Sequence, residues 1–305
     1  MKSVSIIIVN YNLTENIRNL LTTIDQNVKD IDYEVIVVDN NSPDRSVEKL
    51  TSEFPQFRFE FLNTNYGFGH GNNVGAFKTT GKYLLLLNPD TYLVDNLPLK
   101  LYHFAEKHPD YGIIGPRLYF PDGTIQISAA KFPNLKQEIA YHFGLLSIGL
   151  NLIYKLKEKL YKGEYYKVDF VFGSCMFINR EVFETVKGFD ERYFLLSEET
   201  DFCYEVRKNT DYQIIYWRGA KIIHLKSQIT GQNVPSRIKL AYESKLRFFN
   251  KHYSVIRVFI LRIYIITLFT LKYLTIFRKK YRRQDYKETY LRIIKIYINL
   301  AGLNK

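Results

Sequence analysis

Cysteine is scarce in this chain of 305 residues, which contains only Cys175 and Cys203. Two thiols outside a Cys-x-x-Cys pair cannot build a disulfide scaffold, so we expect a protein of a reducing compartment. The apolar run at the start, Val4 to Val9, is too short for a secretory leader. The sequence also lacks internal repeats and low-complexity tracts, and 46% of its residues are hydrophobic. This composition predicts a globular protein with a buried core.

Acidic residues are nearly missing from the last fifth of the chain. From Lys245 to Lys305 there are 15 basic residues and 2 acidic ones, whereas the preceding 244 residues hold 28 basic and 29 acidic. The net charge of +12 therefore belongs to the C-terminal end. We expect a neutral domain over residues 1–244 and a basic, aromatic-rich tail over residues 245–305.

The tail also lacks a long uncharged run. Residues 255–277 are mostly apolar but include three basic residues. Each central Lys or Arg costs roughly 2.5–3.5 kcal/mol in a membrane-spanning helix, so we expect an interfacial amphipathic helix instead. The basic cluster at residues 278–283 would then contact anionic head groups, and a second amphipathic stretch runs over residues 290–300. Because the tail is rich in Ile, Leu and Phe, a membrane surface is favoured over nucleic acid.

Strand and helix patterns alternate in the first hundred residues. Short β-branched or leucine-rich runs are separated by helical spacing, which predicts an α/β fold with a mostly parallel central sheet. The predicted strands cover residues 4–9, 33–38, 57–62 and 83–87. Further along, we expect a helix over 72–80, an apolar segment over 140–156, a helix over 198–208, and strands over 213–217 and 220–225. Ligands of such sheets bind beyond the carboxyl ends of the strands.

Polar residues follow three of these strands. Asn10 and Asn12 follow the first strand, Asp39 ends the second, and Asn88-Pro89-Asp90 follows the fourth. Asp39 is either a turn cap or an acceptor for a nucleotide's base N–H or ribose hydroxyls. Asp90, whose direction Pro89 restricts, can bind a hard divalent cation that also binds phosphate oxygens.

A glycine-rich segment, Asn65-Tyr-Gly-Phe-Gly-His-Gly-Asn-Asn-Val-Gly75, lies between the third and fourth predicted strands. It is not a phosphate-binding Walker loop, because no Gly-Lys-Ser/Thr follows. We interpret it as a loop whose backbone passes close to a nucleotide.

Three carboxylates gather within four residues at Glu198, Glu199 and Asp201, next to apolar side chains. They can be the acidic first turn of a helix, which the helix dipole favours. They can also supply a general base whose pKa is raised by like charges and partial burial. His224 ends a predicted strand and is either a hydrogen-bonded structural residue or a ligand; the other histidines show no zinc-like spacing with it.

The order of these motifs resembles the inverting family 2 glycosyltransferases, which have a nucleotide-diphospho-sugar-binding GT-A fold. The nearest resemblance is to the bacterial rhamnosyltransferase-like branch used in surface polysaccharide assembly. The resemblance covers roughly residues 3–252. The matching stretches are Ser5-Ile-Ile-Ile-Val-Asn-Tyr-Asn12, Val35-Ile-Val-Val-Asp-Asn-Asn-Ser42, Asn65 to Gly75, Leu84-Leu-Leu-Leu-Asn-Pro-Asp-Thr91, Phe172 to Arg180, Gly188-Phe-Asp-Glu-Arg-Tyr-Phe194, Ser197-Glu-Glu-Thr-Asp-Phe-Cys203 and His224.

The resemblance implies a donor site and a metal site. Its nucleotide-sugar-binding residues would be Asn10, Tyr11, Asn12, Asp39, Asn72 and Asn88. Asn88-Pro89-Asp90 stands where the family has Asp-x-Asp, with Asn in place of the first aspartate. Asp90 would therefore be the main protein ligand for Mg²⁺ or Mn²⁺ on the diphosphate, with His224 near the diphosphate or the metal.

The resemblance also implies a catalytic base. Glu199 falls where the family's base, usually aspartate, is found; Glu198 is the nearest rival, and Asp201 would orient the site. The implied reaction is a single displacement that moves rhamnose or another hexose from a dTDP- or UDP-linked donor to a saccharide acceptor, plausibly lipid-linked. The catalytic domain would cover residues 1–244. The tail would hold the enzyme on the cytoplasmic face of the cell membrane, without binding nucleic acid.

Two other functions remain open from the residues. A nucleotidyltransferase can have a similar sheet, although this sequence lacks its glycine-rich activation loop followed by Lys or Arg near the N-terminus. A non-catalytic module on the membrane surface could bind sugar nucleotides without turning them over.

Overall fold

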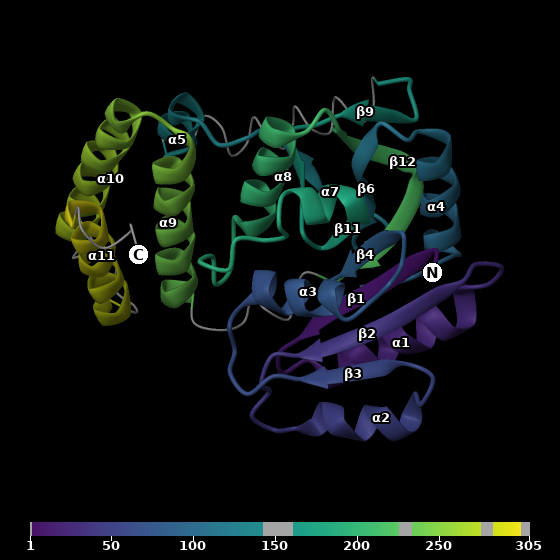
Figure 1. The fold of residues 1–305 in the computed structure, drawn as a ribbon. Helices are drawn as coiled ribbons and strands as arrows, with labels where there is room; N and C mark the ends of the chain where they lie inside the picture. The colour runs from purple at the N-terminus through teal and green to yellow at the C-terminus, as the bar shows by residue number, and fades with distance from the viewer. Residues whose placement is uncertain (1, 143–160, 226–233, 276–282, 300–305) are drawn as a thin grey trace. The chain divides into compact units, whose positions relative to one another are not determined.

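The computed structural model describes residues 2–142, 161–225, 234–275 and 283–299 (Figure 1). The chain divides into two compact units, each assembled from separate stretches. The first unit comprises Met1–Phe132, Tyr154–Arg192 and Glu198–Ile229, and the second comprises Pro133–Ile153, Tyr193–Ser197 and Thr230–Lys305. The predicted boundary after residue 244 lies inside a helix of the second unit, Val234–His252.

The first half of the first unit follows the predicted alternation of strands and helices. Its elements are β1 (Val4–Asn10), α1 (Thr14–Asn27), β2 (Tyr33–Asp39), the 3₁₀ helix η1 (Ser46–Lys49), α2 (Leu50–Glu53), β3 (Arg58–Phe61), α3 (Phe68–Phe77), β4 (Tyr83–Leu87), β5 (Thr91–Tyr92) and α4 (Leu97–Lys107). Strands β1 and β4 are buried along their whole length, as their unbroken apolar sequences require. Helix α3 begins at Phe68, four residues before the predicted start, so the glycine-rich segment is helical from Phe68 to its end at Gly75.

The second half of the first unit has shorter strands. Its elements are β6 (Tyr111–Tyr119), β7 (Ile125–Gln126), β8 (Ala129–Ala130), β9 (Tyr165–Lys167), β10 (Phe170–Val171), β11 (Cys175–Asn179), α7 (Arg180–Thr185), α8 (Glu198–Asn209) and β12 (Gln213–His224). The two strands predicted over 213–225 are one strand, β12, because an irregularity between Trp217 and Lys221 absorbs residues 218–220 without ending its pairing with β6.

The central sheet is mixed, with the order β3-β2-β1-β4-β11-β6-β12-β5. Strands β3, β2, β1 and β4 are parallel, since a helix or a long loop connects each to the next. Strand β11 is antiparallel to both β4 and β6, and β12 is parallel to β6 but antiparallel to β5. The register pairs Asn10 with Asp39, so the polar ends of β1 and β2 lie side by side.

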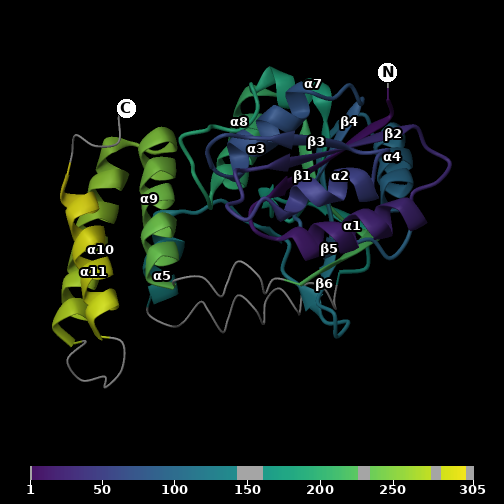
Figure 2. The same ribbon diagram turned by 90° about the horizontal axis from the view of Figure 1, so that it is seen from below.

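Helices cover both faces of this sheet (Figure 2). One buried cluster joins the sheet to α1 and α4, and a second joins its other face to α3, α7 and α8. Helix α3 approaches β1 very closely: a Cβ at Gly71 would lie 2.7 Å from Cγ1 of Val9, and a Cβ at Gly75 would lie 2.4 Å from Cγ2 of Ile7. Glycine at these two positions therefore sets the distance between helix and sheet.

The second unit is helical. It contains α5 (Leu135–His142), α9 (Val234–His252), α10 (Val255–Thr275) and α11 (Arg283–Ile298), with α10 and α11 side by side in both views (Figures 1 and 2). Its buried side chains include Phe249, Leu261, Ile265, Phe269 and Ile293. None of the described helices is long and apolar enough to cross a membrane. The predicted apolar segment over 140–156 lies mostly outside the described residues, as do the basic cluster over 278–283 and the last residue of the stretch over 290–300.

Candidate functional site

The ends of β1 and β2 form a buried hydrogen-bonded cluster around Asp39. The amide of Asn10 donates to Oδ1 of Asp39 over 2.7 Å and to Oγ of Ser42 over 3.2 Å. The backbone N–H of Ser42 donates to Oδ2 of Asp39 over 2.9 Å, and its hydroxyl donates to Oδ1 over 2.6 Å. Both roles considered for Asp39 therefore remain possible. Its carboxylate closes a turn, and it lies at the carboxyl end of β2, where nucleotides bind in such sheets.

Tyr11 and Asn12 continue the chain beyond β1. Tyr11 is 39% exposed, so its ring is accessible next to the buried Asp39 cluster. Asn12 has a φ of 57°, and its backbone N–H donates to Oγ of Ser42 over 2.9 Å. The left-handed backbone at Asn12 turns the chain from β1 toward α1, which begins two residues later.

Asn40 connects this edge to the glycine-rich segment. Its amide donates to the carbonyl of Gly67 over 2.9 Å, and its Oδ1 accepts from the N–H of Tyr66 over 3.2 Å. Gly67 has a φ of 95°, a conformation that side chains disfavour, and α3 begins immediately after it. Within α3, the buried amide of Asn72 donates to the carbonyl of Phe68, one turn earlier. The segment therefore pairs a fixed turn with a helix N-terminus rather than forming one open loop.

A buried acid and histidine lie at the end of β4 and β12. Asp90 is 2% exposed and His224 is 7% exposed, and Nε2 of His224 lies 3.2 Å from Oδ1 of Asp90. This contact is not a hydrogen bond, and Oδ1 of Asp90 is buried without a hydrogen-bond partner. A buried carboxylate oxygen in this condition is costly unless another group compensates its charge.

Gln126 determines which nitrogen of His224 faces Asp90. The Nε2 amide of Gln126 donates to the backbone carbonyl of His224, so its Oε1 faces Nδ1 of the ring at 3.0 Å. An amide oxygen only accepts, and Nδ1 must therefore carry the ring proton. In the neutral imidazole, Nε2 then presents its lone pair toward Asp90.

These residues fit a divalent cation. A nitrogen lone pair and a carboxylate oxygen 3.2 Å apart repel each other unless a proton or a cation lies near both. Adjacent ligands of an octahedral Mg²⁺, at about 2.0–2.1 Å from the metal, are about 3 Å apart. Asp90 and His224 could thus hold a metal, and Gln126 would orient the histidine.

Glu198 and Glu199 begin α8 and differ in exposure. Glu198 is 4% exposed, whereas Glu199 is half-buried. Burial, and then the neighbouring charge of Glu199, raise the pKa of Glu198 well above its usual value. The Oε2 atom of Glu198 is buried without a hydrogen-bond partner. Glu198 is therefore the glutamate better suited to hold a proton, and Glu199 is the more exposed of the two, although its Oε2 atom is buried as well.

The segment before α8 has a strained backbone. Leu196 and Ser197 have φ values of 70° and 72°, which non-glycine residues rarely adopt. Within the second unit, the hydroxyl of Ser244 on α9 donates to the carbonyl of Leu195 over 3.0 Å, and the guanidinium of Arg247 lies 5.9 Å from the centre of the Tyr193 ring. The segment is thus fixed just before the two glutamates.

The backbones of two other elements pass close to the two glutamates. A Cβ at Gly69, in the first turn of α3, would lie 3.8 Å from Cβ of Glu198. A Cβ at Gly173 would lie 3.8 Å from Cβ of Glu199, and the carbonyl of the next residue, Ser174, accepts from the N–H of Asn88 over 3.0 Å. The start of α3, the end of β4 and the start of α8 are therefore neighbours. Asn88 takes part through its backbone.

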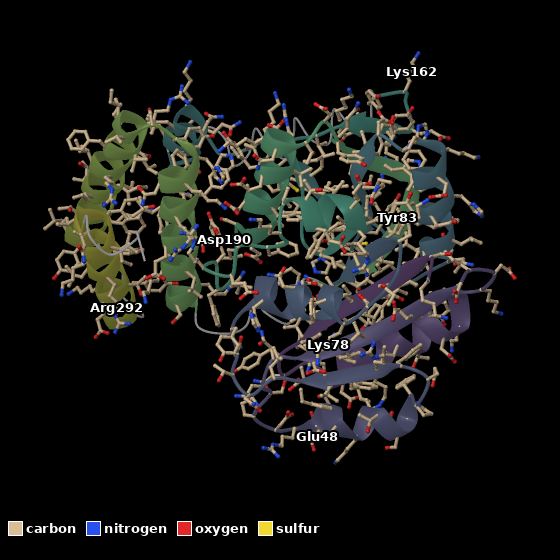
Figure 3. All side chains as sticks on the ribbon, viewed as in Figure 1. Glu48, Lys78, Tyr83, Lys162, Asp190 and Arg292 are labelled. Atoms are coloured by element: carbon tan, nitrogen blue, oxygen red, sulfur yellow. The ribbon has the colours of Figure 1, made fainter. Side chains whose placement is uncertain are left out.

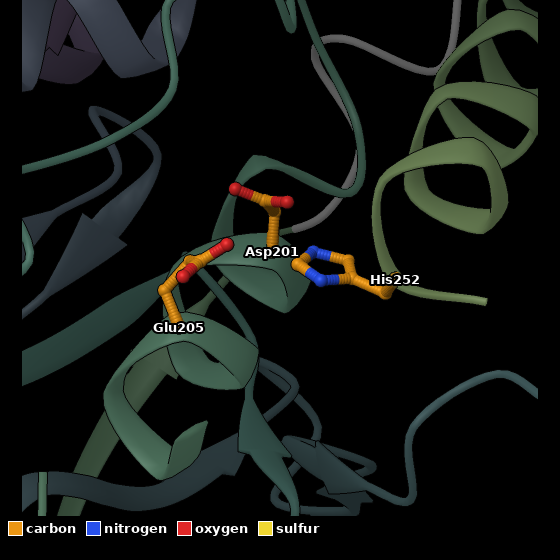
Figure 4. Close-up of side chains that lie close together, drawn as sticks. All are labelled: Asp201, Glu205 and His252. Atoms are coloured by element: carbon orange, nitrogen blue, oxygen red, sulfur yellow. The ribbon is translucent and has the colours of Figure 1, made fainter. Parts of the chain in front are cut away.

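Asp201 lies deeper along α8. It is 1% exposed, and Glu205 follows it one helical turn later (Figure 4). The first turn of α8 therefore carries Glu198, Glu199 and Asp201. This acidic turn agrees with the helix dipole as well as with a catalytic role.

Three residues of the site carry no strong sequence signal. Ser42 and Asn40 stand in a turn-rich cluster where any polar residue is expected, and their contacts to Asp39 and Gly67 depend on the fold. Gln126 follows an Asp-Gly turn, which signals a hairpin but not a contact to His224, 98 residues later.

The mixed sheet, with Asp39 and Asp90 at the carboxyl ends of β2 and β4, agrees with the GT-A fold that the sequence resemblance implies. Residues 5–187 match the family described as "Glycosyl transferase family 2", and the chain belongs to this family. The family assignment favours glycosyl transfer over the nucleotidyltransferase alternative.

Two relatives extend this comparison. The chain is 29% identical over 212 residues to the low-salt glycan biosynthesis hexosyltransferase Agl10 of Haloferax volcanii, covering 68% of this chain and 62% of the relative. It is 26% identical over 235 residues to the N-acetylglucosaminyl-diphospho-decaprenol L-rhamnosyltransferase of Mycobacterium tuberculosis, covering 72% of this chain and 75% of the relative. The chain thus spans less than two thirds of the archaeal relative.

A solved structure supports the fold. TarS 1–349 of S. aureus in complex with UDP-GlcNAc has a TM-score of 0.59 and 15% sequence identity, covering 97% of this chain and 80% of that chain. At this identity the likeness establishes the GT-A fold alone.

Proposed function

We propose that this chain is an inverting hexosyltransferase that moves rhamnose or another hexose from a nucleotide-diphospho-sugar to a saccharide acceptor. The pair of glutamates at the start of α8 carries the proposal, because Glu198 is buried and suited to hold a proton while Glu199 is only half-buried. One ionised carboxylate is what a single displacement requires. A retaining glycosidase instead uses two carboxylates that exchange roles.

The donor's nucleotide would bind at the ends of β1 and β2. Asp39 would accept hydrogen bonds from the base or ribose, while Asn10 and Ser42 hold its carboxylate in place. Tyr11, which is 39% exposed, would offer its ring face to the base. The N-terminus of α3, fixed by Asn40, would add a positive dipole end for the diphosphate.

Asp90 and His224 would hold Mg²⁺ or Mn²⁺. Such a cation, when bound, neutralises charge on the leaving diphosphate. The chain's own contribution is to present Oδ1 of Asp90 and Nε2 of His224 together, with Gln126 keeping the proton on Nδ1. The backbone N–H of Asn88 donates to the carbonyl of Ser174. Asp90 would therefore be the main acidic ligand of the metal.

Glu199 would act as the general base. It removes the proton of the acceptor hydroxyl while that oxygen attacks the anomeric carbon from the face opposite the diphosphate. The bond to the diphosphate breaks as the new glycosidic bond forms, so the anomeric configuration inverts. Glu198 would remain protonated and neutral, and Asp201 would support the first turn of α8.

The nature of donor and acceptor rests on the relatives. The structural neighbour is a complex with UDP-GlcNAc, and the mycobacterial relative is named for a lipid-linked saccharide acceptor. We propose a UDP- or dTDP-linked donor and a lipid-linked saccharide acceptor in surface glycan or polysaccharide biosynthesis. We further propose that the enzyme works at the cytoplasmic face of the membrane, since residues 245–305 carry 15 basic and 2 acidic residues.

Replacing Glu199 with Gln tests the mechanism. We expect E199Q to lower the transfer rate by roughly 10²- to 10⁴-fold, because the amide cannot accept the proton. Donor affinity, measured by calorimetry, should remain near that of the wild type. The matched control is E184Q on α7, where the side chain is 66% exposed.

Two outcomes would contradict this proposal. Transfer by E199Q at a rate near wild type would remove Glu199 from the chemistry. A wild-type protein that binds sugar nucleotides but transfers nothing to any saccharide acceptor would instead support a non-catalytic binding module.

A further inference from the structure

Helix α10 is apolar on two faces, and only one of them is covered by the described residues of the second unit. Val258, Leu261, Ile265 and Phe269 are buried. Another set of large apolar side chains on the same helix is exposed: Val255, Ile256, Phe259, Ile260, Ile263, Leu271 and Leu274. An ordinary surface helix would place polar residues there.

The exposed set forms one continuous face. At 100° per residue, its seven members fall within about 160° of arc, and Thr267 and Thr270 fill the gap between Ile263 and Leu271. The face runs for 20 residues from Val255 to Leu274, which corresponds to about 30 Å of helix. No charged residue of α10 falls within this arc.

The basic residues of α10 point elsewhere. Arg262 is buried, and its Nη1 donates to the carbonyl of Tyr297 on α11 over 2.7 Å. Nζ of Lys272 lies 4.9 Å from the centre of the buried Phe269 ring. Arg257 is exposed at the border of the face. The helix thus keeps its charges away from the exposed apolar face.

This concentration of apolar surface is not scattered exposure. Within the described residues, 17 large hydrophobic side chains are exposed, and seven of them belong to α10. Single exposed apolar residues are normal, but a contiguous patch on one helix marks an interaction surface. The exposed face of α10 is therefore suited to contact an apolar partner.

The surrounding charge identifies the partner. Helix α10 has no acidic residue, and its exposed Arg257 borders the face; Arg292, which projects from α11, is 65% exposed, with its Nη2 3.9 Å from Oε2 of Glu288 (Figure 3). A second copy of this chain would bring the same positive charge to the contact. An anionic bilayer offers negative phosphates around an apolar interior, which complements both the arginines and the apolar face.

We propose that α10 lies in the head-group layer of an anionic bilayer, with the face from Val255 to Leu274 turned toward the acyl chains. This inference rests on the proposed membrane association and names its contact surface. Arg257, at the border of the face, then lies at the level of the lipid phosphates. The helix lies along the membrane and does not cross it.

Vesicle flotation of the full chain tests the proposal. The vesicles contain phosphatidylcholine and phosphatidylglycerol at a ratio of seven to three, with pure phosphatidylcholine for comparison. The variants are F259E and F259K, and the control is F77E, which changes an aromatic side chain that is 91% exposed on α3 of the first unit.

We expect both Phe259 variants to lower the partition coefficient by roughly tenfold or more, because each loses the burial of an aromatic ring. F259K should weaken binding although it adds a positive charge, and F77E should bind as the wild type does. All variants should retain the wild-type circular dichroism spectrum and hydrolysis of the sugar-nucleotide donor, which separates this test from the test of the transferase.

Three results would contradict the proposal that the exposed face of α10 contacts the bilayer. If both Phe259 variants float like the wild type, membrane association survives through charge alone, but α10 is not its contact. If F259K alone retains binding, the contact is electrostatic and not apolar. If light scattering shows a wild-type dimer that F259E dissociates, while vesicle binding is unchanged, a second copy covers α10. Absence of wild-type flotation would reject membrane association itself.

Discussion

Gln126 offers a direct test of the metal site, because it contacts His224 at two points. Its Oε1 accepts from Nδ1 of the ring at 3.0 Å, and its Nε2 donates to the backbone carbonyl of the same histidine. The side chain is 4% exposed, so Gln126→Leu replaces a buried amide with an apolar group of similar size. The substitution removes both hydrogen bonds and leaves the region around Asp90 otherwise intact.

The magnitude follows from the role of the lost bonds. Without an acceptor at Nδ1, the ring can rotate or carry its proton on Nε2, the atom that faces Asp90. Loss of such an orienting partner typically lowers metal affinity 10- to 100-fold, or about 1.4–2.7 kcal/mol. We expect the Mn²⁺ dissociation constant of Q126L to rise by this factor, with a smaller effect on the affinity for the free nucleotide.

The assay is a titration with Mn²⁺ followed by electron paramagnetic resonance, which reports free Mn²⁺ without requiring turnover. Q56L is the matched control, because Gln56 is exposed and its amide donates to Asp25 on the surface. If Q126L binds Mn²⁺ within twofold of the wild type while H224A does not, Gln126 does not orient the ligand. If H224A also binds normally, His224 is not a ligand.

Two further predictions concern stability. The pKa of Glu198 is raised in the folded protein, so the stability of the wild type should fall as the pH rises above about 4.5, the ordinary pKa of a glutamate, toward the folded pKa. E198Q should lack this loss of stability. The melting temperatures of the two proteins should therefore diverge between pH 5 and 8 and converge below about pH 4.5. Parallel melts across that range would contradict the buried protonated state. G75A places a Cβ 2.4 Å from Cγ2 of Ile7 and should lower the free energy of unfolding by about 1–3 kcal/mol in urea titrations, less the ~1 kcal/mol that alanine gains in a helix; an unchanged midpoint would show that α3 can move away from β1.

The strands that the sequence predicts best are those with continuous burial. The runs Val4–Val9 and Tyr83–Leu87 are apolar along their length because helices cover both faces of the sheet, and the structure confirms both strands. The sheet is more mixed than the alternation suggests. Strand β11 inserts antiparallel between β4 and β6, which are distant in sequence, and no local pattern reports such a long-range pairing.

The candidate site follows the same division. Asp39, Asp90 and the carboxylates Glu198, Glu199 and Asp201 are predicted from the sequence because they stand at the end of an apolar strand or the start of a helix, and the family resemblance singles out Glu199 as the base. The state of each carboxylate depends on contacts from elsewhere in the chain: Ser42 for Asp39, His224 and Gln126 for Asp90, and burial for Glu198. The glycine-rich segment was expected to be a loop near the nucleotide. Its last two glycines instead serve helix packing on β1, a demand that composition cannot distinguish from ligand approach.

The five residues from Tyr193 to Ser197 have a consequence for exchanging parts between relatives. They belong to the helical unit, where Ser244 holds Leu195, yet one peptide bond separates them from Glu198. A chimera joined at residue 230 would combine α9 of one relative with the segment 193–197 of another. The contact between Ser244 and Leu195 could then be lost, which would change the backbone just before α8. A functional graft therefore has three pieces, residues 133–153, 193–197 and 230–305, and the shortest of them directly precedes the proposed base.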